Sequence, residues 1–179
     1  MLAPATFPPY GGASCQAGFI FTRWAVGLRL IDEDGQEHGW APVDPSKNES
    51  NLAYPHCLPD GRVLGVIRSE DRDAIAVFDA ERRAVLLELP SETVAWPVFA
   101  TDGYILFERA EPNPGIGAVP VSDDVSSTTG PPVLILPGGR QPSVSDDGVL
   151  VAVAGTGRVD RHLVWVDREG HQLSEFGRP

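Results

Sequence analysis

Four histidines are the residues of this chain best suited to bind a metal ion or to move a proton, but their spacing supports neither role. They are His38, His56, His162 and His171. No two of them stand in a ligand pattern such as His-x-x-x-His. Serines are plentiful, but none lies in the Gly-x-Ser-x-Gly turn that exposes the nucleophile of an α/β-hydrolase. We therefore predict no catalytic residue, no cofactor and no metal site, and we expect the chain not to be an enzyme.

Clusters of carboxylates are the second group that could do chemistry, as acid–base pairs or as calcium ligands. They are Asp32-Glu33-Asp34, Glu70-Asp71 with Asp73, Asp123-Asp124 and Asp146-Asp147. Each cluster falls in an expected turn, where Asp commonly accepts hydrogen bonds from its own backbone. The calcium-loop spacing, with its Gly and terminal Glu, is missing. We interpret these clusters as turn residues.

Charge and length exclude some classes of partner. The chain has 179 residues, 25 of them acidic and 14 basic, and a net charge of −11. Such a field repels a phosphate backbone, so we expect no nucleic acid partner. No apolar run approaches the roughly 20 residues that span a bilayer, and "MLAPATFPPYGG" lacks the pattern of a signal peptide. We therefore expect no membrane contact by this segment.

Two cysteines, Cys15 and Cys57, are too few for a disulfide framework or an unaided zinc site. Two interpretations stay open. They are small buried apolar residues, or they form one bridge in an oxidising compartment.

One phrase of the sequence is repeated at a nearly constant interval. Aligned on the turn glycines Gly18, Gly61, Gly103 and Gly148, the copies are 43, 42 and 45 residues apart. Three copies read Pro, four residues, Asp-Gly: "PHCLPDG", "PVFATDG" and "PSVSDDG". Asp-Gly between apolar runs predicts a hairpin with a type I′ turn, and the proline suits the first residue of a strand.

Further apolar runs complete four short strands in each unit. The second and third runs are "GLRLID" and "HGWAPV", "AIAVFD" and "AVLLEL", "IGAVPV" and "PVLIL", and "HLVWVD" and "HQLSEF". Four antiparallel strands at this period predict an all-β fold, a β-propeller, with no helix longer than about two turns. A β-sandwich also has evenly spaced strands, but it needs no fixed turn phrase. We expect a tail over residues 1–9 and a partial propeller over 10–179, with blades at about 10–50, 51–92, 93–138 and 139–179.

Several segments resemble a known family. "LPDGR" at 58–62 resembles the Ser-Pro-Asp-Gly phrase of TolB-like, WD-type β-propellers. "IGAVPVSDDVSSTTGPPVLI", "PSVSDDGVLVAV" and "HLVWVDREGHQLSEFGRP" resemble the propeller that follows the kinase domain in many bacterial serine/threonine kinases, and "YGGASCQAGFIFT" is similar to its entry blade. The resemblance implies a six- to eight-bladed, extracytoplasmic propeller that binds or senses and does not catalyse.

The chain departs from that family in three ways. Its first unit lacks the Pro and the Asp-Gly, so its turn should differ. The sequence stops at "FGRP", where another unit would begin, and it carries no kinase signature. We expect an arc of about four blades whose exposed end blades favour self-association. The alternative function is the gating propeller of a prolyl-oligopeptidase-type serine peptidase.

The predicted ligand contacts are the residues at the start of each inner strand, near the channel mouth of a propeller. Tyr54, Trp96 and Gln141 each precede a repeat proline, and His56 and Arg140 lie beside them. We predict that these five residues contact a protein or small-molecule ligand, whose identity the sequence does not give. Trp24, Trp40 and Trp165 are interpreted as packing residues.

Overall fold

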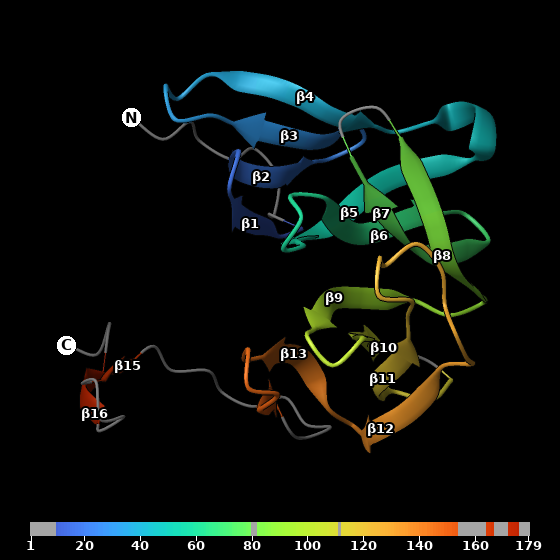
Figure 1. The fold of residues 1–179 in the computed structure, drawn as a ribbon, viewed down its shortest axis with the longest axis vertical. Helices are drawn as coiled ribbons and strands as arrows, with labels where there is room; N and C mark the ends of the chain where they lie inside the picture. The colour runs from blue at the N-terminus through green and yellow to red at the C-terminus, as the bar shows by residue number, and fades with distance from the viewer. Residues whose placement is uncertain (1–9, 80–81, 111, 154–163, 167–171, 176–179) are drawn as a thin grey trace.

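Figure 1 shows the fold of a computed structural model of the chain, which describes residues 10–79, 82–110, 112–153, 164–166 and 172–175. The expected tail, residues 1–9, and two of the histidines, His162 and His171, lie outside the described residues. The described chain is all-β, as predicted, and its one helical element is a single 3₁₀ turn, η1, at Pro45–Lys47.

Three consecutive units each form a four-stranded antiparallel sheet in which the strands follow chain order. The first sheet holds β1 Gly12–Cys15, β2 Gly18–Arg23, β3 Gly27–Ile31 and β4 Glu37–Pro42. The second holds β5 Glu49–Cys57, β6 Val63–Ser69, β7 Arg72–Phe78 and β8 Arg83–Pro90. The third holds β9 Val94–Ala100, β10 Tyr104–Arg109, β11 Gly115–Pro120 and β12 Val133–Pro137. We call these sheets blades 1, 2 and 3.

The fourth unit differs from the single sheet that the repeat predicts. It contains β13 Arg140–Val144 paired with β14 Leu150–Val153, and β15 Val164–Val166 paired with β16 Gln172–Glu175. These are two separate two-stranded sheets, because no ladder of hydrogen bonds joins β14 to β15 in the described chain.

The core lies between successive blades rather than inside any one of them. In β6, Leu64 and Val66 belong to the cluster shared with blade 3, while Val63 and Ile67 belong to the cluster shared with blade 1. Side chains of a strand alternate between its two faces, so a sheet with two buried faces reads as a nearly continuous apolar run. A smaller cluster joins blade 3 to β13 and β14. Face-to-face stacking of four-stranded meanders is compatible with a partial β-propeller, and Figure 1 shows the blades as an open arc.

The repeated Asp-Gly pairs form hairpin turns as predicted, but the predicted turn type is wrong. Gly61 N–H donates to the Leu58 carbonyl at 3.0 Å, and Leu58 N–H donates to the Arg62 carbonyl at 2.8 Å. Gly61 has φ +87°, whereas Asp60 is not among the residues with positive φ. The loop therefore has three residues, a type I turn closed by a left-handed glycine, and not the two-residue type I′ turn.

The other turns agree with this description. Gly103 and Gly148 both have φ +82°, and each donates to the carbonyl three residues earlier. The first unit has a different turn, as expected, since Cys15 pairs directly with Gly18 across a two-residue loop.

A bulge in the first strand of the units corrects the role given to the prolines. Pro55, Pro97 and Pro142 lie inside β5, β9 and β13, not at their first residues. Each forms, with the residue before it, a pair that faces one residue of the neighbouring strand. A proline at a bulge has no N–H to pair, so it removes no ladder hydrogen bond there.

The residue at the start of each bulge has a left-handed backbone. Tyr54, Trp96 and Gln141 have φ between +50° and +54°, and Gly11 occupies the same repeat position with φ +96°. Unit 1 has no room for a side chain there, because a Cβ on Gly11 would lie 3.0 Å from Cα of Tyr54. Residues other than glycine rarely adopt this conformation, which costs about 1 kcal/mol or more each. Its recurrence makes the bulge a regular part of the repeat.

The structure decides between the two interpretations of the cysteines, buried apolar residues or one bridge, in favour of the bridge. Cys15, at the end of β1, and Cys57, at the end of β5, form a disulfide with Cα atoms 5.6 Å apart. The bridge joins blade 1 to blade 2 at the strands that line the inside of the arc.

Candidate functional site

Four aromatic rings form a continuous row at the repeated bulges, which we call the aromatic row. Ring centroids are 5.0 Å apart for Trp24 and Tyr10, 6.2 Å for Tyr10 and Tyr54, and 4.7 Å for Tyr54 and Trp96. Trp24 follows β2, Tyr10 precedes β1, and the other two lie on β5 and β9. The row therefore crosses three consecutive blades.

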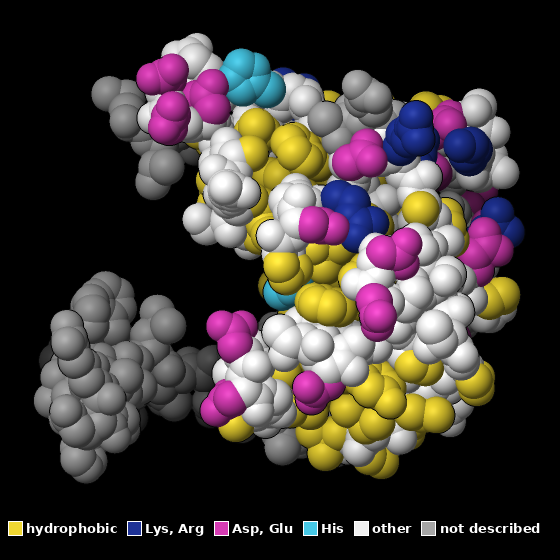
Figure 2. All heavy atoms as spheres, viewed as in Figure 1, with side chains coloured by type: hydrophobic (Ala, Val, Ile, Leu, Met, Phe, Trp, Pro, Cys, Tyr) yellow, Lys and Arg dark blue, Asp and Glu magenta, His cyan; other side chains and the backbone are white. Residues whose placement is uncertain are grey.

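Hydrogen bonds to the Tyr10 carbonyl fix the backbone in the middle of the row, and the two ends of the row remain open to solvent. Tyr54 N–H donates to the Tyr10 carbonyl at 2.6 Å, and the Thr22 hydroxyl donates to the same carbonyl at 3.2 Å. The two ends of the row are the most accessible, with Trp24 42% and Trp96 36% exposed. Figure 2 shows the molecule hollowed on the inside of the arc, with hydrophobic side chains exposed along that side. Exposed Trp and Tyr rings in fixed positions are typical of binding surfaces.

Arg68 on β6 contacts the centre of the row at Tyr54. Its guanidinium carbon lies 5.7 Å from the centroid of the Tyr54 ring, which allows a cation–π contact. Nη1 of Arg68 lies 2.6 Å from Oδ2 of Asp73, and its Nη2 donates to the Val94 carbonyl at 3.0 Å. The same Asp73 oxygen accepts the Val94 N–H at 2.9 Å. This pair thus ties blade 2 to the start of β9, two residues before Trp96.

Burial of Asp73 has an electrostatic cost. Desolvation raises the pKa of its carboxyl, and the Val94 N–H and the Arg68 charge oppose that rise without cancelling it. A carboxylate held in this way suits a fixed support for the row better than a proton-transfer role, because its contacts with Arg68 and with the Val94 N–H are structural.

The structure brings two of the five predicted ligand contacts, Tyr54 and Trp96, into direct contact. Gln141 has the same backbone conformation, and its N–H donates to Oε2 of Glu108 at 2.8 Å. Arg140 Nε reaches the other oxygen of that carboxylate at 3.3 Å. Gln141 and Arg140 therefore continue the line of bulges onto β13. No ring contact joins either residue to the aromatic row.

His56 lies on β5, two residues after Tyr54, and opposite Leu64 of β6. Its side chain is partly buried, and burial lowers the pKa of its imidazole. Within the described chain it makes no hydrogen bond or ion pair. Because its pKa is lowered, it is neutral at pH 7 and adds an uncharged donor and acceptor rather than a positive charge.

Sequence reasoning missed Tyr10, Trp24, Arg68 and Glu108. Tyr10 stands one residue before Gly11, the equivalent of Tyr54, so the repeat register could have pointed to it. Trp24 was interpreted as a packing residue, and it does stand at the end of β2 against Tyr10, but half in solvent. Trp40 packs against the core between blades 1 and 2, as expected.

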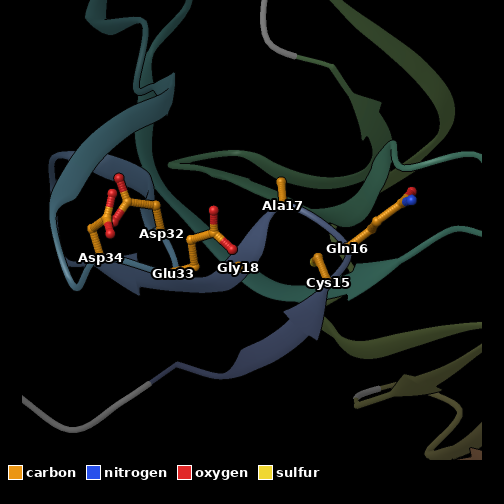
Figure 3. A pocket seen from close by; sticks show the side chains of 7 residues that line it. All are labelled: Cys15, Gln16, Ala17, Gly18, Asp32, Glu33 and Asp34. Atoms are coloured by element: carbon orange, nitrogen blue, oxygen red, sulfur yellow. The ribbon is translucent and has the colours of Figure 1, made fainter.

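A shallow pocket of about 380 Å³ lies at one end of the strands of blade 1, between the first hairpin turn and the turn from β3 to β4. Figure 3 shows its acidic lining, Asp32, Glu33 and Asp34, beside Cys15. Both carboxylate oxygens of Asp32 already have partners within the protein. Oδ1 accepts the Gln36 N–H at 2.8 Å, and Oδ2 lies 2.6 Å from Nε2 of His38. The Gln36 hydrogen bond, followed by that of His38, lowers the pKa of Asp32.

Asp124 and Asp147 serve their turns in the same way, and so does Asp60 of the first repeated Asp-Gly pair. The turn role predicted for Asp73 is wrong, because this residue lies in β7, is buried and is paired with Arg68. Asp60 accepts the Arg62 N–H at 3.0 Å, and Asp124 accepts the Ser126 N–H at 3.2 Å. Asp147 accepts the Ser145 hydroxyl. Among the described residues, no group of three or more His, Cys, Asp or Glu side chains is arranged to hold a metal ion. No helix in the described part of the chain has the length and hydropathy of a membrane span.

Comparison of the chain with protein-family models, with curated proteins and with solved structures finds no significant match in any of the three. The interpretation of the site therefore depends on its own geometry.

Proposed function

We propose that this chain is a non-catalytic β-propeller module that binds a ligand or protein partner through the aromatic row, as a sensor or scaffold. The observation that carries the proposal is the position of the row. Its rings stand at the left-handed bulge of blades 2 and 3 and at the equivalent point of blade 1. Trp96 combines a strained backbone with a ring that is 36% exposed, and Trp24 is 42% exposed, so the two ends of the row gain little from burial. Tyr54, between them, also packs against the core shared by blades 2 and 3.

We propose further that the module belongs to a larger bacterial regulatory protein, such as a serine/threonine kinase. Support comes from the resemblance of the "IGAVPV", "PSVSDDG" and "HLVWVD" segments to kinase-associated propellers. The Cys15–Cys57 disulfide favours an oxidising compartment and agrees with an extracytoplasmic location. A kinase domain encoded upstream supports this assignment, whereas an α/β-hydrolase domain downstream supports the peptidase alternative.

A thermal-shift experiment tests the binding proposal. The purified chain is screened with short peptides, amino acids and soluble oligosaccharides. A ligand at a hundred times its Kd stabilises the folded state by about 2.7 kcal/mol, which raises the Tm of a chain this size by about 5–10 °C. We expect at least one compound to stabilise the wild type and not the Trp24→Ala/Trp96→Ala variant.

The matched control is Phe19→Ala, which removes an exposed aromatic ring from the outer face of blade 1, away from the row. This variant should respond to the compound like the wild type. A stabilising compound that acts equally on the double variant would place the binding site elsewhere. A screen without any stabilising compound would contradict the proposal.

A further inference from the structure

We infer that the aromatic row takes an extended proline-rich segment in the polyproline II conformation, a ligand class that rests on the proposed binding function. The first observation is the length of the row. Four rings in succession cross three blades, from Trp24 beside β2 to Trp96 on β9. A surface of this form contacts an extended chain along its length, whereas a compact small molecule would contact one or two rings.

The second observation is the set of polar atoms that the row leaves unused. In the described chain, the indole N–H groups of Trp24 and Trp96 and the hydroxyls of Tyr10 and Tyr54 have no hydrogen-bond partner. An indole N–H only donates, and a phenol O–H donates readily. The row therefore offers the exposed apolar surface of its two end indoles together with four donor groups, and its complement is a ligand with apolar rings and acceptors.

A polyproline II segment has that composition. Its proline rings are apolar and lack N–H groups, and its carbonyls are not used in internal hydrogen bonds. It is already extended before binding, so docking on an aromatic surface costs little conformational entropy. An oligosaccharide also stacks on aromatic rings, but its hydroxyls donate as well as accept. Those hydroxyl donors would need acceptors beside the row. The carboxylates of Asp73, which is paired with Arg68, and of Glu108, which accepts the Gln141 N–H, already accept hydrogen bonds from the protein.

Charge favours the same ligand over an acidic one. The chain carries a net charge of −11, and the cation at the row, Arg68, is paired with Asp73. A neutral or basic proline-rich segment meets no repulsion from this surface, whereas a phosphorylated or acidic peptide does.

Isothermal titration calorimetry with a ten-residue polyproline peptide tests the inference, with a Gly-Ser peptide of equal length and cellohexaose as comparison probes. We expect the wild type to bind polyproline and not the Gly-Ser peptide. Trp24→Ala and Trp96→Ala should each weaken binding about tenfold or more, because each removes one end of the row. Phe19→Ala should leave the Kd unchanged. Circular dichroism of each variant shows whether the fold is retained.

The outcomes separate this inference from the proposed function. Binding of cellohexaose but not polyproline, lost in Trp96→Ala, would overturn the proline assignment and keep the row as a binding site. Polyproline binding that survives in both tryptophan variants would overturn the placement on the row. Absence of polyproline binding by the folded wild type would overturn the inference itself.

Discussion

Removal of the disulfide between blades 1 and 2 should destabilise the protein by an amount that follows from the chain topology. Cys15 and Cys57 are 42 residues apart in sequence, and their bridge closes that loop in the unfolded chain. In the chain-entropy account, a loop of this length reduces the unfolded-state entropy by about 13 cal/mol/K, or about 4 kcal/mol at 25 °C. Among the described residues, the core cluster that holds blade 1 is the one shared with blade 2, so blade 1 depends on that packing and on this bridge for its attachment.

The assay is equilibrium unfolding in urea of the wild type and of the Cys15→Ala/Cys57→Ala variant. With an m-value of about 2 kcal/mol/M, the loss of about 4 kcal/mol lowers the unfolding midpoint by about 2 M. Dithiothreitol should lower the wild-type midpoint to a similar value and leave the variant unchanged. Amide exchange should accelerate first in β1–β4 and later in β9–β12, because only the first blade loses its covalent attachment.

A midpoint that is equal in the wild type and the variant would refute this reasoning. It would show that packing in the cluster between blades 1 and 2 fixes blade 1 without the covalent link. Exchange that accelerates equally in all blades would refute the local part of the prediction, since it would mean that the arc unfolds as one unit.

Three further predictions concern pH, backbone strain and assembly. Burial lowers the pKa of His56 in the fold, so its contribution to stability is fully present above the unfolded value of about 6.5 and is lost as pH falls below 6.5 toward the lower pKa of the folded state; His56→Gln should remove this part of the pH dependence of urea midpoints between about pH 7.5 and 5. At the left-handed position 141, Gln141→Gly should be about 1 kcal/mol more stable than Gln141→Ala, whereas Ser143→Gly should be less stable than Ser143→Ala; the same order at both positions would contradict the assigned φ. Val151, 64% exposed on the face of β14 that points away from blade 3, should contribute to self-association, and Val151→Asp should shift sedimentation toward the monomer; a wild type that is monomeric at all concentrations would contradict this.

The repeat could be predicted from the sequence because its signals are local. Asp60-Gly61 and its two equivalents stand between apolar runs, and both the turn position and the antiparallel partner follow from that pattern. The turn type could not be predicted in the same way. It depends on whether Leu58 or Pro59 is the last paired residue, and this one-residue difference is set by the register of the whole blade.

The left-handed backbone of the bulge could not be predicted, because the usual preference of a residue before proline argues against it. The residue before a proline normally prefers an extended backbone, so Tyr54 and Trp96 are expected to continue their strands. At this point of the blade, two residues of the first strand face one residue of the next strand. The strand hydrogen bonds on either side of the bulge outweigh the local preference for an extended backbone.

The disulfide and the aromatic row needed the three-dimensional stacking of blades. Cys15 and Cys57 lie 42 residues apart and meet only because β1 and β5 are neighbouring inner strands. Tyr54 and Trp96 could be predicted as equivalent residues from the repeat, but their contact depends on how closely successive bulges approach. Trp24 lies in the turn between β2 and β3, and no spacing in the sequence connects it to Tyr10.

Binding of a ligand at the aromatic row can be observed through the indole N–H resonances in an NMR titration. The described tryptophan side chains provide an internal comparison, because Trp24 and Trp96 are exposed at the ends of the row while Trp40 packs against the core. With any ligand that stabilises the protein, we expect the Trp24 and Trp96 signals to shift together and saturably while the Trp40 signal stays in place. Binding that leaves both row signals unmoved would contradict this expectation.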